Sequence, residues 1–141
     1  GRPSSEVDRA WLVQRELLAA IRDRMVERGG RLLVVFVAIK EARSEEAFRK
    51  TVVAPFERPG LALDVDRDRP GRRLQVICDE LDVPFVDLNP VFRSHEQPDG
   101  LFLRRNGHWS VAGHALAAEA VARRLTECGL AVPRQPGAIS R

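Results

Sequence analysis

Three histidines, His95, His108 and His114, are the side chains of this sequence best suited to proton transfer near neutral pH. His108 lies two residues before Ser110, the predicted cap of the final helix, within a stretch that has no hydrophobic periodicity. Backbone N–H groups at a helix start disfavour the imidazolium and so help to keep the ring neutral, as a general base requires. We therefore take His108 as the candidate general base.

The other two histidines are weaker candidates. His95 follows Ser94, but adjacent side chains in a loop rarely meet productively, and we expect His95 to be exposed. His114 is predicted on the buried face of the final helix, as a hydrogen-bonded structural residue. It is six residues from His108, which is not the i, i+4 spacing of a helical zinc pair.

No pattern predicts a metal site. Cys78 and Cys128 form no CxxC pair, and we interpret them as two buried thiols rather than a disulfide. Asp64, Asp66 and Asp68 alternate like the start of a calcium loop. The glycine and glutamate that such a loop needs at its sixth and twelfth positions are replaced by arginine and glutamine, which excludes an EF-hand.

The composition is that of a globular chain, with 44% apolar and 30% charged residues. No apolar run approaches the ~18 residues of a membrane helix, and the start at Gly1 shows no signal-peptide pattern. The net charge of +3 comes from scattered arginine pairs, and aromatic residues make up 6% of the chain. We therefore expect no nucleic-acid partner.

The chain is predicted to alternate helices with two buried strands. The Ser5 region begins a helix over residues 6–28, which ends at Gly29 and Gly30. The predicted order continues with a strand over 32–39 that is buried on both faces, a helix over 44–54 capped by Ser44, and a helix capped by Asp68 with Pro70 in its first turn. A strand over 85–88 and an irregular stretch over 89–109 follow. The last elements are a helix from Ser110, with His114, Ala118, Val121, Leu125 and Cys128 on one face, and a frayed tail over 130–141. This order indicates an α/β fold with a parallel sheet.

The predicted sheet is too small to stand alone, because a stable sheet normally needs three or more strands. We therefore interpret residues 1–141 as a single domain that is incomplete at its N-terminus. Either a missing N-terminal segment or a homo-oligomer would complete the sheet. Ligands of such sheets bind beyond the carboxyl ends of the strands, which is where the stretch holding His108 would lie.

One segment gives a specific resemblance. Residues 101–114, with the run Gly107-His108-Trp109-Ser110, resemble the last conserved block of SGNH/GDSL-type hydrolases, and Asp87-Leu88-Asn89-Pro90 resembles the end of their preceding strand. The closest form is familiar from bacterial envelope proteins, including alginate O-acetylation proteins. The resemblance covers residues from about 6 to 128 and implies that the chain is the C-terminal part of such a domain.

The resemblance implies a flavodoxin-like three-layer α/β/α sandwich and a serine–histidine–aspartate mechanism on an acyl ester. The base falls on His108 and the orienting acid on Asn106, while Trp109 either lines the substrate pocket or packs under the last helix. The implied substrate is a small-molecule or carbohydrate acyl ester, and no metal or organic cofactor is needed.

Two departures leave the function open. Residue 106 is an amide where the family has aspartate, so either Asp99 or Asp87 substitutes for the acid or the site is weak or inactive. In addition, no serine stands in a Gly-Asp-Ser motif after a buried strand. The leading hypothesis is an ester hydrolase or O-acetyl transfer domain whose nucleophile lies upstream of Gly1. The alternatives are a non-catalytic SGNH-like module that binds carbohydrate or protein, and an unrelated flavodoxin-like domain that dimerises.

Overall fold

The computed structural model describes residues 5–59, 63 and 65–130. Its helices and strands are α1 (Ser5–Glu27), β1 (Val34–Phe36), η1 (Lys40–Arg43), α2 (Glu45–Phe48), η2 (Arg49–Val53), η3 (Ala54–Phe56), α3 (Arg69–Glu80), β2 (Phe85–Asp87), α4 (Leu88–Arg93), η4 (Pro98–Leu101) and α5 (Val111–Glu127). The predicted tail over 130–141 falls outside the described residues except for Leu130.

The two strands pair in parallel, with Val34 opposite Phe85 and Phe36 opposite Asp87. In the part of the chain that is described, the sheet consists of β1 and β2. The strand predicted over 32–39 is only three residues long, and its residues are half-buried rather than buried on both faces. The pairing stops where β2 stops, because Asp87 already caps α4 and the chain turns away.

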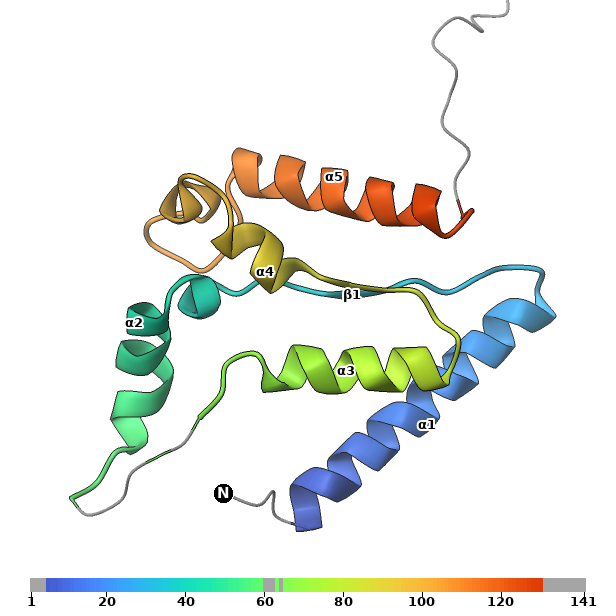
Figure 1. Ribbon diagram of the computed structural model, residues 1–141, viewed down its shortest axis with the longest axis horizontal. Coiled ribbons are helices and arrows are strands. Elements are labelled where there is room, and N and C mark those ends of the chain that lie inside the picture. The colour runs from blue at the N-terminus through green and yellow to red at the C-terminus, as the bar shows by residue number, and fades with distance from the viewer. Residues whose placement is uncertain (1–4, 60–62, 64, 131–141) are drawn as a thin grey trace, which may run out of the picture.

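Helices cover both faces of this sheet, so the predicted α/β class and layered arrangement are confirmed. Figure 1 shows α5 along one side of the strands and α3 with α1 along the other. Alternate strand residues point to opposite faces. Accordingly Val35 and Val86 pack in a cluster with α4 and α5, while Val34, Phe36 and Phe85 pack in a cluster with α1 and α3.

Helix α1 is less buried than its periodicity predicts. Leu18 is its buried residue, and Trp11, expected in the core, is only half-buried against the cluster of α3. Leu17 and Ile21 of the predicted apolar stripe are about half exposed. The reason is geometric: among the described residues α1 packs along a narrow line against α3 and β1, so one row of side chains is covered and the neighbouring rows are not.

Two of the predicted helix caps are confirmed. The Ser44 hydroxyl accepts a hydrogen bond from the N–H of Ala47 at 3.1 Å, and the Ser110 hydroxyl accepts one from Gly113 at 3.2 Å. The helix predicted over 44–54 is in fact three short turns of different pitch, α2, η2 and η3. Pro55 lies in the last of them, where it prevents the preceding turn from continuing as an α-helix.

The predicted cap at Asp68 is wrong. Asp68 precedes α3, and Pro70 does lie in the first turn, but the Asp68 side chain makes no capping hydrogen bond. Its carboxylate pairs with arginines instead, as described below. The buried stripe of α3 is as predicted, since Ile77, Cys78 and Leu81 are buried and Leu74 packs against them.

The stretch predicted as irregular over 89–109 contains the short helices α4 and η4. Phe92 of α4 and Leu101 of η4 are among the most deeply buried side chains described. Hydrophobic periodicity cannot reveal such short helices, because each contributes only a few residues to the core. No helix within the described ranges has the length and apolar character that a membrane crossing requires.

Candidate functional site

The candidate site is a cavity of about 370 Å³ at the carboxyl end of β1. One wall is the segment that leaves β1, from Val37 to Glu41. The other is formed by Gly107, His108, Trp109 and His114. This is the edge of a parallel sheet where ligands are expected, so the predicted location of His108 agrees with the geometry.

A tight turn presents His108 to this cavity. Phe102 and Trp109 form an antiparallel bridge, and the N–H of Leu103 donates to the carbonyl of His108 at 2.8 Å. Next to the bridge, the Ser110 N–H donates to the Leu101 carbonyl at 2.9 Å. The bridge fixes the two ends of the segment Leu103–His108, which we call the histidine turn.

Trp109 joins the histidine turn to the core. Its indole Nε1 donates to the carbonyl of Ala38 at 2.9 Å, directly after β1. Its ring packs on Phe92 at 5.1 Å and meets the edge of the His114 ring at 5.4 Å. Trp109 therefore both packs under α5 and lines the cavity, and its contact with substrate stays a prediction.

Asn106 and His108 are brought together through the backbone. The Asn106 side-chain oxygen accepts a hydrogen bond from the backbone N–H of His108 at 3.3 Å. The His108 side chain is exposed, and among the described residues its imidazole has no hydrogen-bond partner. In this geometry Asn106 shapes the turn rather than contacting the ring.

The carboxylates considered as substitutes for the missing aspartate are engaged elsewhere. Asp99 forms an ion pair with Arg43. Asp87 accepts two hydrogen bonds from Asn89, one from its backbone N–H at 2.8 Å and one from its side-chain amide at 3.0 Å. Glu41, which the sequence analysis did not single out, is the carboxylate that lines the His108 cavity. Its position two residues after the end of the apolar run over 32–39 was the available signal.

His114 is not on the buried face of α5, contrary to expectation. Its side chain is exposed, and the buried residues of this helix are Gly113, Ala117 and Ala120. Gly113 decides this rotation, because a Cβ there would collide with the carbonyl oxygen of Leu101. Since only glycine allows that close approach, α5 turns its small residues inward and His114 outward.

The Ser94–His95 pair forms no catalytic dyad. The Ser94 hydroxyl donates to the carbonyl of Val91 at 3.0 Å, and His95 Nδ1 accepts from the N–H of Gln97 at 3.1 Å. Both side chains are exposed, as expected for His95. Within the described ranges, no three histidine, cysteine, aspartate or glutamate side chains are grouped to hold a metal ion.

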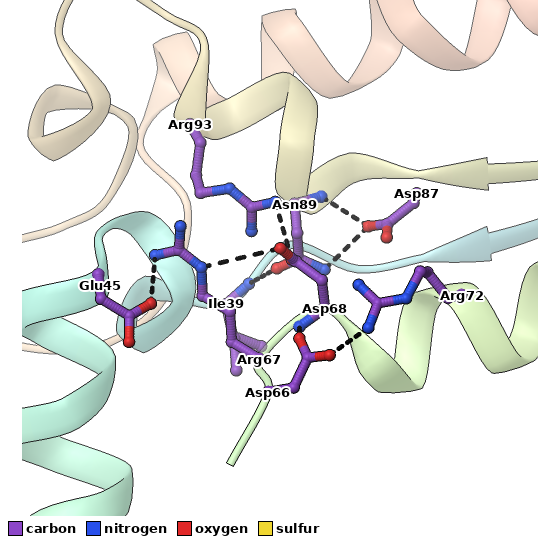
Figure 2. Close-up of polar contacts among 9 residues, drawn as sticks. All are labelled: Ile39, Glu45, Asp66, Arg67, Asp68, Arg72, Asp87, Asn89 and Arg93. Carbon is purple, nitrogen blue, oxygen red and sulfur yellow. Dashed lines mark hydrogen bonds and ion pairs between the residues drawn. The ribbon is translucent and has the colours of Figure 1, made fainter. Parts of the chain in front are cut away.

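A second polar cluster lies beyond the strand ends, around Asp68 (Figure 2). The Asp68 carboxylate pairs with Arg93 at 2.8 Å and with Arg67 at 3.9 Å, and Arg67 also lies 3.6 Å from Glu45. These pairs connect the segment before α3 with α2 and α4. This competition from two arginines is the reason why Asp68 does not cap α3.

The neighbouring Asp66 carboxylate also belongs to this cluster. It accepts the N–H of Asp68 at 2.9 Å and pairs with Arg72. The Asp68 N–H, followed by the Arg72 guanidinium, lowers the pKa of Asp66 from its ordinary value. Asp66 and Asp68, two of the three aspartates of the calcium-like alternation, thus form ion pairs with arginines, whereas Asp64 lies outside the described residues.

The turn after β2 connects this region to the cavity. Asn89 is a buried polar residue, 7% exposed, and its side-chain oxygen accepts from the backbone N–H of Ile39 at 3.3 Å (Figure 2). Ile39 lines the His108 cavity. The fold therefore places a histidine-bearing turn, a carboxylate and an ammonium group around one cavity at the sheet edge.

Taken together, a parallel sheet covered by helices and a histidine at its carboxyl edge define an SGNH-like α/β domain. Comparison with protein families agrees: the model of the SGNH hydrolase-like domain of the acetyltransferase AlgX matches residues 5–138. The chain belongs to this family.

A solved structure supports the same fold. The chain is similar to the O-acetyltransferase domain of Pseudomonas putida AlgJ, with a TM-score of 0.68 and 18% sequence identity, over 93% of this chain and 44% of that one. The chain thus spans less than half the length of that structure. A comparison with curated proteins finds no match.

Proposed function

We propose that this chain is the histidine-bearing part of an SGNH-type domain that transfers or hydrolyses O-acyl groups, with acetyl esters as the substrate class. The observation that carries the proposal is the exposure of His108 on a cavity at the carboxyl end of β1. The family model is that of an acetyltransferase domain, which supports acetyl as the acyl group that is transferred. A partly acetylated carbohydrate would supply both the ester that is cleaved and the hydroxyl that accepts the acyl group.

In the proposed reaction, His108 accepts the proton of a serine hydroxyl as its oxygen attacks the ester carbonyl. The proton then passes from His108 to the leaving alcohol as the ester C–O bond breaks, and the acyl group remains on the serine. A second hydroxyl, from water or a carbohydrate, attacks the acyl-serine while His108 accepts its proton. The bond between the acyl carbon and the serine oxygen then breaks, and His108 returns the proton to that oxygen. Among the described residues, no serine lines the cavity, so we assign the nucleophile to a segment outside them.

In this proposal, Asn106 and Glu41 share the role of the missing aspartate. Asn106 stands at the motif position of the acid and holds the backbone of His108 in place. Glu41, on the opposite wall of the same cavity, supplies the negative charge that stabilises the imidazolium. Because Glu41 is not held against the ring by a hydrogen bond in this chain, we expect a slower site than one with an aspartate at position 106.

The amide at position 106 also favours a second candidate function, a non-catalytic module that binds carbohydrate or protein. A binding module needs the cavity and Trp109 but neither the nucleophile nor the acid. In that case the exposed rim of the cavity would contact a glycan without cleaving its esters.

The test uses a longer protein that contains these 141 residues together with the proposed serine, and a chromogenic acetyl ester as substrate. His108→Ala should reduce kcat/KM by about 10²–10⁴, the range for loss of a general base. His95→Ala is the matched control, because that side chain is exposed and lies outside the cavity, and it should leave the rate unchanged. Equal rates for wild type and His108→Ala would remove His108 from the mechanism, and glycan binding without turnover would favour the binding module.

A further inference from the structure

The histidine turn has fixed ends but few contacts along its length. Its base is closed by the hydrogen bond from the Leu103 N–H to the His108 carbonyl and by the bridge between Phe102 and Trp109. The side chains from Leu103 to His108 are all exposed. The contact between Asn106 and the His108 N–H is local to the turn and does not reach the opposite wall of the cavity, so the tilt of the turn, which sets where the His108 imidazole lies, depends on contacts from outside it.

One residue from the opposite wall of the cavity makes the missing contact. The Lys40 ammonium donates to the carbonyl of Leu103 at 2.9 Å and to the carbonyl of Arg104 at 3.0 Å. Lys40 begins η1, shortly after the end of β1. Hydrogen bonds from a charged donor are stronger than neutral ones, so this link is well suited to hold a turn that lacks core contacts.

The backbone of Lys40 is itself braced. Arg43 donates to the Lys40 carbonyl at 2.9 Å and also pairs with Asp99 of η4, the short helix that precedes the histidine turn. Among the ion pairs of the described residues, Lys40 has no carboxylate partner. Its three N–H donors are thus available for the two carbonyls of the turn.

We propose that Lys40 is a positioning residue that holds the histidine turn, and with it His108, over the cavity at the carboxyl end of β1. Its catalytic meaning rests on the function proposed above, whereas the mechanical claim concerns this chain alone. The other titratable groups facing the cavity are Glu41 on η1, His108 on the turn and His114 on α5.

The choice of lysine agrees with this role. Only Lys40 and Lys50 are lysines among the 23 basic residues of the sequence. An ammonium is compact and has three donors on a rotatable tip, so it reaches the carbonyls of two successive residues, whereas the planar guanidinium fork is suited to paired oxygens of one group. Lys40→Arg should therefore restore the function of Lys40 only in part.

The first test measures amide hydrogen exchange in the longer protein that contains this chain. Lys40→Met keeps the aliphatic stem but removes the donors, and the amides of Leu103 and His108 should then exchange at least about tenfold faster, with the amides of α5 unchanged. Lys50→Met, an exposed lysine outside the cavity, is the control and should change neither. Unchanged exchange at Leu103 and His108 in Lys40→Met would overturn the proposal.

The second test uses the longer protein with the acetyl ester. Because misplacement of a reacting group by about 1 Å can cost ~10²-fold, Lys40→Met should lower kcat by ten- to a hundredfold with KM changed less than twofold. Lys40→Arg should recover part of the loss. Equal kcat values for wild type and Lys40→Met would overturn the positioning role. Faster exchange in a protein that cleaves no acyl ester would instead retain the positioning role and reject the proposed function.

Discussion

The side-chain oxygen of Asn89 accepts a hydrogen bond from the backbone N–H of Ile39 at 3.3 Å, which joins the two segments that leave the carboxyl ends of β1 and β2. Asn89 also donates to Asp87, so one buried amide fixes the geometry of both strand exits (Figure 2). Since Ile39 lines the His108 cavity, the shape of the cavity depends on this contact between residues fifty positions apart.

Replacing Asn89 by alanine should lower the free energy of unfolding by about 1–3 kcal/mol, because the variant loses two part-buried hydrogen bonds, one from the Ile39 N–H and one to Asp87. Chemical denaturation followed by circular dichroism measures the change. Asn106→Ala is the matched control: its side chain is exposed, and the loss should stay below about 1 kcal/mol. Equal losses in the two variants would mean that the hydrogen bonds of Asn89 contribute no more to the free energy of unfolding than those of the exposed Asn106.

Asn106→Asp should increase turnover of acetyl esters by the longer protein. In a serine triad, exchanging the acid for an amide costs about 10⁴ in turnover, which sets the upper limit of the gain. We expect a gain of at least tenfold, because a carboxylate stabilises the imidazolium by its charge. The gain should stay below the upper limit, because the aspartate can reach the imidazole only if it gives up its contact with the His108 backbone. Initial rates with a chromogenic ester test this, and a decrease in kcat would show that the amide is required at this position.

The effect of Gly113→Ala has a sign that the tertiary structure decides. In an exposed helix interior this change stabilises by up to about 1 kcal/mol. Here the added methyl group would collide with the Leu101 carbonyl and approach the Trp109 Cβ to 3.1 Å, so we expect a loss of about 1–3 kcal/mol.

Thermal unfolding of Gly113→Ala beside Ala115→Gly, an exposed position of the same helix, separates the two effects. Ala115→Gly should cost no more than about 1 kcal/mol from helix propensity. A melting temperature for Gly113→Ala at or above that of the wild type would contradict the close packing of α5 against η4.

The two free thiols should differ in reactivity. Cys78 is fully buried, and burial, followed by the nearby Asp79 charge, raises the pKa of its thiol, so it stays protonated and inaccessible at neutral pH. Cys128, at the end of α5, is partly exposed. Native protein should therefore incorporate one equivalent of iodoacetamide at Cys128, and the second only after unfolding. Modification of Cys78 in the folded Cys128→Ser variant at a rate near that of Cys128 would disprove this.

The sequence alone was sufficient where structure depends on neighbours within one helical turn. The caps at Ser44 and Ser110 are of this kind, since donor and acceptor are three residues apart. The buried stripe of α3 and the position of His108 two residues before the cap of α5 were predictable for the same reason, and the α/β class followed from the apolar strand.

The tertiary structure decided everything that depends on which surface each element meets. Asp68 was predicted as a cap, but its carboxylate pairs most closely with Arg93, which lies 25 residues further along the chain. His114 was predicted inside, but the close approach of Gly113 to Leu101 turns it outward. The contacts of Lys40 with the histidine turn span more than sixty residues, so local spacing holds no trace of them. The hydrophobic periodicity of a segment indicates that one of its faces is buried, whereas the residues that this face contacts are determined only when distant segments pack together.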